Sequence, residues 1–408
     1  MMPVRVLHVL EATAGGTMHF MENIAEAIEG VNVTSAFAYG LARADSHLEP
    51  FLAKIRSRGW YTFPIKMCRQ INACADAVAI RELGRAIKLF SPDILHLHSS
   101  KAGGLGRLSA ALHRSSAIRL YSPHALASPL GSKYLKIERW LTRYTDRFVA
   151  VSESERQEMI RLLNVSAASV DVVYPSIDPE YFAPMRQGEA RRRLGLGDNP
   201  LVVSIGRLTL QKDPMSFIQI VRRLHEKRRE LRGVWIGSGE GEEEFREQVK
   251  AAGLGNVVSV VPWMHDVREY IAAADVLLST SRFESFGYVT AEALSMLRPV
   301  VASAVTGTRD IMTERLQKWM YPRNDFDHAA RLLDGILTER GEASELAEYG
   351  RSLVIRRFSV DAMRERLTGV YTTALMSMRR HGTFPSLAGD TNMGSTARSH
   401  ALRDDAPA

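Results

Sequence analysis

Two cations stand near the start of the second half of the chain, directly after an apolar run. Residues 201–205 lead into Gly206 and Arg207, and Lys212 follows on the same short stretch. We expect this stretch to be a loop at the carboxyl end of a strand, where two cations can hold a diphosphate from two sides. Plain surface charges would need no such position. The pair therefore predicts a phosphate-binding loop.

Two glutamates follow further along, separated by seven residues. Glu284 precedes Phe286 and Gly287, and Glu292 lies in a predicted helix over 290–297. One carboxylate can sit at the mouth of a cleft and the other inside the helix, so that both bind hydroxyl groups of one ligand. Two solvated glutamates are the commoner arrangement for this residue type. The spacing alone leaves both interpretations open.

A glycine pair, Gly15 and Gly16, separates the first apolar run from a predicted helix over 18–28. Glycine lacks the Cβ that would obstruct a phosphate, and the N-terminus of a helix offers free N–H donors. The same pair would also serve in any tight turn of an α/β fold. No Gly-Lys-Ser/Thr sequence occurs in the chain, so a Walker-type nucleotidase is not expected.

Three other motifs argue against particular cofactors. The glycine-rich segment 237–241 resembles a dinucleotide fingerprint, but glutamates 242–244 follow it and place negative charge where a pyrophosphate would bind. Asp325 and Asp327 precede a predicted helix, so a helix cap is a more natural interpretation than a metal site. Cys68 and Cys74 form neither a metal-binding spacing nor a disulfide framework. We expect a cytoplasmic protein that needs no metal and no other cofactor.

The elements that position these residues follow a repeated pattern. Short apolar runs alternate with amphipathic stretches, which is typical of strands and crossover helices in a parallel sheet. The first half has predicted strands at 4–10, 33–39, 94–98, 119–122 and 148–151. The pattern restarts with predicted strands at 201–205, 233–236, 257–261, 276–279 and 300–303. The repetition predicts an α/β fold with two similar domains.

Prolines and an arginine run mark the boundary between the two halves, because proline excludes regular structure. We expect a first domain over 1–174, a second over 175–358, a C-terminal helix over 359–378 and a disordered tail over 379–408. The composition, with 45% hydrophobic and 24% charged residues, is that of a globular protein. A formal net charge of +7 is too mild to indicate binding of nucleic acid, so no such partner is expected.

The apolar runs are also too short for a membrane-spanning helix, which needs about 18 or more consecutive apolar residues. The first ten residues, with one arginine and no small-residue cleavage site, predict a buried strand and not a secretory leader.

Three motifs together resemble a known family. They are the Gly-Arg loop ending in Gln211-Lys212-Asp213, the spaced glutamates with their Phe-Gly, and the run His98-Ser99-Ser100-Lys101-Ala102-Gly103. Over roughly residues 4–378 the chain resembles the retaining glycosyltransferases of family 4. The resemblance implies the GT-B architecture, in which two Rossmann-like domains with parallel sheets face each other across a cleft and a C-terminal helix returns toward the first domain. The 98–103 run and Pro123-His124 are most similar to enzymes of bacterial exopolysaccharide, O-antigen, lipopolysaccharide or capsule assembly.

The resemblance also implies a role for individual residues. Arg207 and Lys212 would hold the donor diphosphate, and Glu292 would bind the ribose hydroxyls. The other implied contacts with donor or acceptor come from His124 near the reacting sugar, from Glu284 beside it with Phe286 and Gly287, and from Gly15 and Gly16. The family usually has glycine after that histidine. This chain has Ala125 and Leu126 instead, a departure that bears on backbone geometry and sugar preference.

The implied reaction transfers a sugar from a UDP- or GDP-sugar to a growing glycan, linked to a polyprenyl diphosphate, with retention of configuration. Positive charge grows on the sugar and negative charge on the leaving phosphate, which protein cations would stabilise without a metal. A GT-B nucleotide-sugar epimerase is one alternative, and it would return an intact nucleotide sugar. A catalytically silent glycan-binding protein is the other, and it would not need both cations and both glutamates.

A basic segment between Lys101 and Arg147 points to a membrane surface. On a helical wheel one stripe contains Lys133, Lys136, Trp140, Arg143 and Arg147, and another contains Tyr134, Ile137, Leu141 and Tyr144. A basic face with an exposed Trp suits the anionic inner leaflet, where each cation contributes about 1 kcal/mol. An ordinary solvated helix with a half-buried Trp is the alternative. We expect Lys101 and the first stripe to face the acceptor or the inner face of the cytoplasmic membrane.

Overall fold

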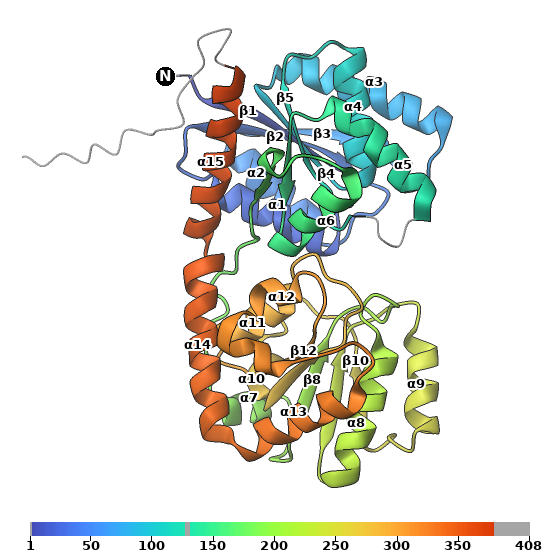
Figure 1. Cartoon of the computed structure of the whole chain (residues 1–408), viewed down its shortest axis with the longest axis vertical. Helices are drawn as coiled ribbons and strands as arrows, with labels where there is room; N and C mark the ends of the chain where they lie inside the picture. Colours follow the sequence, from blue (N-terminus) through green and yellow to red (C-terminus); the bar gives the residue numbers. More distant parts are fainter. Residues whose placement is uncertain (1, 127–130, 379–408) are drawn as a thin grey trace, which may run out of the picture.

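The computed structural model describes residues 2–126 and 131–378, and it contains two parallel β-sheets covered by helices (Figure 1). The predicted α/β class with two Rossmann-like domains is confirmed. The first sheet has the strand order β3-β2-β1-β4-β5-β6-β7. Its strands are β1 (Val4–Leu10), β2 (Val33–Gly40), β3 (Tyr61–Ile65), β4 (Ile94–His98), β5 (Ile118–Ser122), β6 (Arg147–Ala150) and β7 (Val170–Val172).

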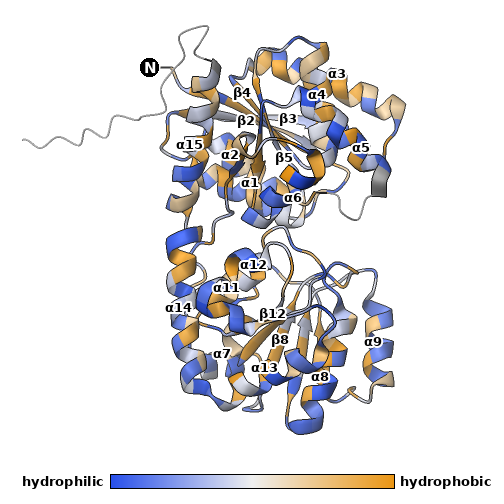
Figure 2. Cartoon of the chain, viewed as in Figure 1, coloured by the Kyte–Doolittle hydropathy of each residue, from blue (hydrophilic) through white to orange (hydrophobic). Residues whose placement is uncertain are grey.

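The central strands of the first sheet are buried on both faces. The helices that cover it are α1 (Gly15–Ala27), α2 (Leu48–Ser57), α3 (Ala73–Phe90), α4 (Ser100–Leu112), α5 (Gly131–Leu141) and α6 (Glu153–Leu163). Val6 and Leu10 pack into a core with α1 and α2, whereas Leu7 and Val9 pack into a second core with α3 and α4. Burial on both faces explains why five of the seven residues of β1 are apolar. The strands of the two sheets are hydrophobic for much of their length (Figure 2).

The second sheet has the order β10-β9-β8-β11-β12-β13 and one continuous hydrophobic core. Its strands are β8 (Leu201–Ile205), β9 (Arg232–Ile236), β10 (Val258–Val261), β11 (Val276–Ser279), β12 (Val300–Ser303) and β13 (Met320–Tyr321). Its helices are α7 (Gln187–Arg193), α8 (Pro214–Lys227), α9 (Glu242–Ala251), α10 (Arg268–Ala273), α11 (Tyr288–Ser295), α12 (Thr308–Ile311), α13 (Phe326–Thr338) and α14 (Arg340–Phe358).

Each sheet reverses its strand order beside its first strand. β1 lies between β2 and β4, and β8 lies between β9 and β11. In open α/β sheets, ligands bind beyond the carboxyl ends of the strands at such a reversal. Gly15 comes shortly after β1, and Arg207 comes shortly after β8. The fold therefore places both predicted phosphate-contacting segments at ligand-binding positions.

The last two helices connect the domains along one side of the molecule (Figure 1). α14 packs on α11, where a Cβ on Gly350 would lie only 2.7 Å from Leu294 Cδ2. The chain breaks at Ser359, and α15 (Val360–Met378) returns to the first domain. There Met363, Leu367 and Tyr371 are buried in the core that contains α1. The helix predicted to return toward the first domain is confirmed.

Three strands were not expected from the sequence: β3, β7 and β13. β3 lies at the edge of its sheet, is only partly buried and contains Pro64. β7 and β13 are also edge strands, with three and two residues. Edge strands this short carry too few residues to show a pattern. The segment 379–408, predicted as a disordered tail, lies outside the described residues.

Candidate active site

Arg207 stands on a loop that the neighbouring strand β9 holds in place. Trp235 Nε1 donates a hydrogen bond to the Gly206 carbonyl oxygen at 2.9 Å. A Cβ on Gly237 would lie 2.1 Å from that same oxygen, so this close approach requires glycine. The Arg207 side chain is exposed, and within the described part of the chain no ion pair or hydrogen bond engages its guanidinium. A free cation thus stands at the carboxyl end of β8.

Lys212 and Glu284 form an ion pair next to this loop. Lys212 Nζ donates to Glu284 Oε1 at 2.5 Å, and Ser281 Oγ donates to the same oxygen at 2.6 Å. The hydroxyl of Thr280 also donates to the Lys212 carbonyl oxygen at 2.8 Å. These bonds tie the loop after β8 to the loop after β11. They bring together two residues that are 72 positions apart in the sequence.

Glu292 lies on α11, which begins after Gly287 in the left-handed region at φ 103°. Its carboxyl group is close to His19 of the first domain and to Lys212. Burial raises the pKa of Glu292 to about 7, although the charges of His19 and Lys212 oppose the rise. The carboxyl group therefore changes its charge near neutral pH.

The glycine pair faces α11 from the first domain. A Cβ on Gly16 would lie 3.8 Å from a ring carbon of Tyr288, and the Tyr288 hydroxyl donates to Asn23 Oδ1 at 3.1 Å. Gly15 has φ 60°, and its N–H donates to Asp45 Oδ2 at 3.2 Å. The N-terminus of α1 thus lies opposite the N-terminus of α11, across the two domains.

His124 follows β5 with φ 58°, and Ala125 has φ 134°. The second domain contacts this turn directly, because Ser285 Oγ donates to the His124 carbonyl oxygen at 2.6 Å. Burial lowers the pKa of the His124 imidazole to about 3, so the ring is neutral at neutral pH. The structure therefore gathers His124, the 284–292 segment and the Arg207 loop on facing sides of the two domains.

Glu155 is a positioning residue that the sequence analysis missed. Its Oε1 accepts from Ala125 N–H at 2.8 Å and its Oε2 from Val151 N–H at 2.7 Å. These bonds hold Ala125 in the backbone conformation in which the family usually has glycine. Ser152 Oγ accepts from Glu155 N–H at 3.1 Å, so the Ser-x-x-Glu capping box is the signal that could have found this residue.

Asp310 is a second residue that sequence reasoning missed. Its carboxylate comes from α12 of the second domain and accepts from the N–H groups of Glu153 at 2.7 Å and Ser154 at 3.2 Å. These groups are free donors at the N-terminus of α6 in the first domain, where a negative charge is stabilised. Residues 153 and 310 are 157 positions apart, and no local pattern predicts such a contact.

Two expected site residues point elsewhere. The Phe286 ring is buried and packs against Tyr288 and Phe358 at centroid distances of 5.4 and 5.1 Å, so it supports the loop from the core. Lys101 is not free to face an acceptor or a membrane. Its ammonium pairs with Asp76 Oδ1 at 2.6 Å and donates to the Gln70 carbonyl oxygen at 2.8 Å.

The predicted basic stripe is wrong in its last part. α5 ends at Leu141, a 3-10 turn over Thr142–Tyr144 follows, and Arg147 begins β6. Arg147 forms two hydrogen bonds with the Asp171 carboxylate, at 2.8 and 2.9 Å, and is only partly exposed. The helical wheel fails here because pairing of β6 with β5 ends the helix before the stripe is complete.

The remaining surface of this segment, which we call the α5 face, is apolar and basic. Its exposed apolar side chains are Tyr134 (42%), Ile137 (45%) and Trp140 (43%), and its exposed cations are Lys133, Lys136 and Arg143. The Arg143 guanidinium lies 5.1 Å from the Trp140 ring centroid. Tyr134 and Ile137, placed on a separate stripe by the wheel, therefore share the exposed surface with Trp140.

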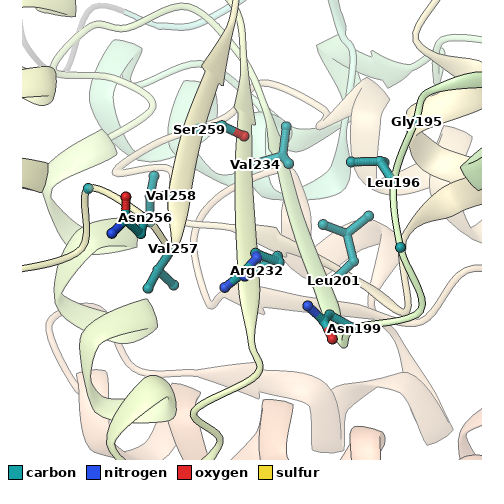
Figure 3. Close-up of a pocket in the computed structure, with 12 residues that line it drawn as sticks. Gly195, Leu196, Asn199, Leu201, Arg232, Val234, Asn256, Val257, Val258 and Ser259 are labelled. Carbon is teal, nitrogen blue, oxygen red and sulfur yellow. The ribbon is translucent and has the colours of Figure 1, made fainter.

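The Asp-x-Asp motif has a local structural role. Asp325 Oδ1 accepts from His328 N–H at 3.0 Å at the start of α13, and Asp327 pairs with Arg223 at 2.8 Å. A hollow of about 320 Å³ lies at the other end of the second sheet, at the amino ends of β8, β9 and β10 (Figure 3). Arg232 and Asn256 line it, away from the residues described above. Within the described residues, none of the helices has the length and apolarity to cross a bilayer.

Comparison with known proteins agrees with this fold. The family described as glycosyl transferases group 1 matches residues 186–353, and glycosyltransferase family 4 matches residues 27–181. The D-inositol 3-phosphate glycosyltransferase of Kribbella flavida is 30% identical over 301 residues, which cover 68% of this chain and 69% of that protein. The UDP-Gal:alpha-D-GlcNAc-diphosphoundecaprenol alpha-1,3-galactosyltransferase of Escherichia coli is 24% identical over 317 residues, or 75% of this chain and 81% of the relative.

The fold is also that of solved glycosyltransferase structures. Anabaena HepE, solved in complex with UDP, superposes with a TM-score of 0.77 at 17% identity, covering 91% of this chain and 100% of HepE. The two facing Rossmann-like domains and the crossing helix define a glycosyltransferase of the GT-B type. The chain belongs to the family 4 glycosyltransferases.

Proposed function

We propose that this chain is a retaining, metal-independent hexosyltransferase of surface-polysaccharide biosynthesis. It moves a sugar from a UDP- or GDP-sugar to a growing glycan linked to a polyprenyl diphosphate. The observation that carries the proposal is the free guanidinium of Arg207 beside the Lys212–Glu284 pair, opposite the N-terminus of α1. The Escherichia coli relative, named for a diphosphoundecaprenol-linked substrate, supports the choice of acceptor.

The unused bonding capacity of these groups fits a nucleotide sugar. An ammonium group has three donors, and one of those of Lys212 goes to Glu284, so others remain for phosphate oxygens. Both hydrogen bonds to the Glu284 carboxylate use Oε1, which leaves Oε2 for a sugar hydroxyl. Arg207 offers a planar fork of N–H donors to the diphosphate. Glu292, one turn into α11, then accepts from the ribose hydroxyls.

The same groups explain the reaction step. Charge on the leaving phosphate increases as the glycosidic bond breaks, and Arg207 and Lys212 stabilise it where it develops. The leaving phosphate oxygen accepts the proton of the acceptor hydroxyl on the same face of the sugar. The configuration of the donor is therefore retained, and no protein carboxylate is needed as a base. The cations take the place of a divalent ion at the diphosphate.

The test is release of nucleoside diphosphate from UDP- and GDP-sugars by the purified full-length chain, with and without acceptor. We expect release that depends on the acceptor and is at least about tenfold slower in Arg207→Ala. Arg229→Ala, an exposed arginine beyond the far end of α8, is the matched control and should behave as the parent. An altered but intact nucleotide sugar would identify an epimerase, and absence of any turnover would identify a silent glycan-binding protein.

The acceptor is tested in the same assay. A polyprenyl-diphosphate-linked glycan should support release, whereas inositol phosphate should not. The second compound is included because the Kribbella flavida relative is named as a D-inositol 3-phosphate glycosyltransferase. Turnover with inositol phosphate but not with the lipid-linked glycan would contradict the proposed acceptor. It would not affect the proposed roles of the residues that bind the donor.

We also propose that the α5 face docks the enzyme on the inner face of the cytoplasmic membrane, where a lipid-linked acceptor resides. Three exposed apolar side chains between exposed cations suit the headgroup region of anionic lipid. Lys136 and Arg143 lie on this face, whereas Lys227 and Arg229 lie beyond the site at the far end of α8. The two pairs allow a charge-matched comparison.

In sedimentation with vesicles of acidic phospholipid, the parent should bind and lose binding as salt rises beyond about 0.15 M. Replacing Lys136 and Arg143 with glutamine should weaken binding by about 1–2 kcal/mol, and Lys227→Gln with Arg229→Gln should not. Turnover of a soluble acceptor analogue should be unchanged in both. Equal vesicle binding by the two double variants would refute docking through this face.

A further inference from the structure

Four imidazoles are packed together behind the site: His8 lies in β1, His96 and His98 lie in β4, and His124 follows β5. His8, His96 and His98 are fully buried, and His124 is partly buried. The ring centroids of His96 and His98 are 4.1 Å apart, and those of His98 and His124 are 5.3 Å apart. Burial lowers the pKa of each ring. For His8, where burial is the only cause, the pKa falls to about 3. All four rings are therefore neutral at neutral pH.

Three of these rings form a continuous hydrogen-bonded chain. His124 Nε2 is 3.0 Å from His98 Nδ1, and His98 Nε2 is 3.3 Å from His8 Nδ1. His96 is outside the chain, because its Nδ1 meets the Tyr371 hydroxyl at 3.1 Å and its Nε2 meets Ser122 Oγ at 2.9 Å. The chain runs from the interior of the sheet to the histidine at the domain interface.

A neutral imidazole has one donor and one acceptor nitrogen, so the chain has only two consistent arrangements. In the first, His8 donates to His98 and His98 donates to His124, which leaves the proton of His124 on Nδ1. In the second, every bond is reversed, and His124 Nδ1 has no proton. One tautomer therefore cannot change without changing the other two.

The surroundings of His8, at the inner end of this series of hydrogen bonds, determine which of the two arrangements forms. His8 Nε2 is buried and has no hydrogen-bond partner. The first arrangement leaves an unpaired lone pair there, and the second leaves an unpaired N–H. Buried N–H groups without an acceptor are the rarer of the two in proteins. Phe37 cannot accept from the ring edge, because it stacks almost parallel to His8, at 16° and 4.9 Å.

We propose that His8 and His98 are positioning residues that hold His124 in its Nδ1–H tautomer, so that His124 donates a hydrogen bond to an oxygen of the bound sugar. The proposal rests on the proposed function for the identity of that ligand. Within the described residues His124 Nδ1 has no partner, and the ring edge packs against Phe20 at 4.7 Å. His124 thus acts as a fixed neutral donor and not as a general base, because its acceptor nitrogen faces His98 in the interior.

The tautomer is measured directly by ¹⁵N NMR of histidine-labelled full-length protein without ligand, with resonances assigned from single His→Gln variants. We expect protons on Nδ1 of His124, His98 and His8. A proton on His124 Nε2 would overturn the proposal. Since His8, His96 and His98 offer nitrogen atoms within 4.8 Å of one another, metal content is measured on the same sample. One stoichiometric metal ion on these rings would also overturn it.

His8→Phe removes the end of the chain and keeps an aromatic ring against Phe37. Without His8, the tautomer of His98 is no longer fixed, and that of His124 should become mixed. We expect turnover to fall about 2- to 10-fold, the size of one net hydrogen bond, with KM for the donor nearly unchanged. Tyr371→Phe is the matched control, because it removes a hydroxyl from the same layer that contacts His96 only. Its His124 tautomer and turnover should equal those of the parent.

The two readouts separate this proposal from the proposed function. NMR on the parent gives the tautomer whether or not the chain transfers sugar, and whether or not His8→Phe folds. A single Nδ1–H tautomer of His124 without transferase activity would overturn the proposed function. It would still support the proposed positioning of His124 by His8 and His98. Normal transferase activity with a mixed His124 tautomer in the parent would support the proposed function and overturn the positioning role of His8 and His98.

Discussion

We predict that nucleotide affinity depends on pH through Glu292, the residue that we propose binds the ribose hydroxyls. Its carboxyl group has a pKa of about 7 in the folded protein against an ordinary value of 4.5. The folded protein thus binds more protons than the unfolded chain between these values. This group contributes stability that is lost as pH rises through 7. The ionised carboxylate is the better acceptor for ribose hydroxyls, so donor affinity should increase over the same range.

The magnitude follows from the fraction of ionised carboxylate. With a pKa of about 7, roughly a tenth of the groups are ionised at pH 6 and nine-tenths at pH 8. Apparent affinity scales with the competent fraction, so the contribution of Glu292 should tighten nucleotide binding about tenfold between these pH values. The phosphate of the nucleotide also titrates near pH 6. Its contribution to the pH dependence must therefore be measured in a variant without the Glu292 carboxyl group and subtracted.

Calorimetric titration of UDP and GDP into the parent and Glu292→Gln at pH 6 and pH 8 makes that comparison. The parent should gain about tenfold more affinity than the variant between the two pH values. His19→Gln is the informative control: it removes a neighbour that lowers the pKa of Glu292, so the inflection should move to higher pH. An identical pH dependence in parent and Glu292→Gln would show that ionisation of Glu292 does not control nucleotide affinity.

Three further predictions concern single positions or the product. Lys212→Ala should lower turnover at least about tenfold, with the fold retained by circular dichroism; unchanged turnover would remove Lys212 from the diphosphate site. The product anomer, read by NMR, should match that of the donor, and an inverted linkage would contradict the retaining reaction. Ala125→Gly should raise the free energy of unfolding in urea by about 1 kcal/mol, because Ala125 has φ 134°, which glycine adopts without strain. A lower free energy of unfolding would show that Ala125 is not strained.

The positions of Arg207, Glu284 and Gly15 could be predicted because each follows a strand of a parallel sheet. The carboxyl ends of such strands share one edge, so residues far apart in sequence gather there once the strands are recognised. The apolar runs of β1 and β8 are long and buried, which makes them easy to recognise. The sequence could not show the pairing partner of each side chain, such as Ser281 on Glu284, because that depends on loop conformation.

The basic stripe shows where periodicity misleads. A helical wheel assumes that the helix continues, and nothing local to residues 142–147 forbids it. The helix ends because Arg147 pairs with Asp171 and because β6 joins β5 and β7. These are tertiary interactions with segments up to 27 residues away, as in the Arg119–Asp146 pair. Within α5, Lys133, Lys136 and Trp140 are exposed as the wheel predicts, but so are Tyr134 and Ile137, which the wheel placed on a separate stripe.

Several polar contacts join the two domains next to the residues that we propose bind the donor. Among the described residues, the polar contacts of this interface include Ser285 to His124, Tyr288 to Asn23, and Asp310 to the N-terminus of α6. Ser46 also contacts His265, and Thr306 contacts Glu158. Polar interfaces between domains permit relative motion, whereas α15 is anchored in the core of the first domain. Ser285 follows Glu284 and Tyr288 follows Gly287, so a ligand that orders the 284–292 segment also orders two of these contacts. Binding of a donor and assembly of His124 beside it should therefore be one coupled step, and breaking the Ser285 contact should weaken both.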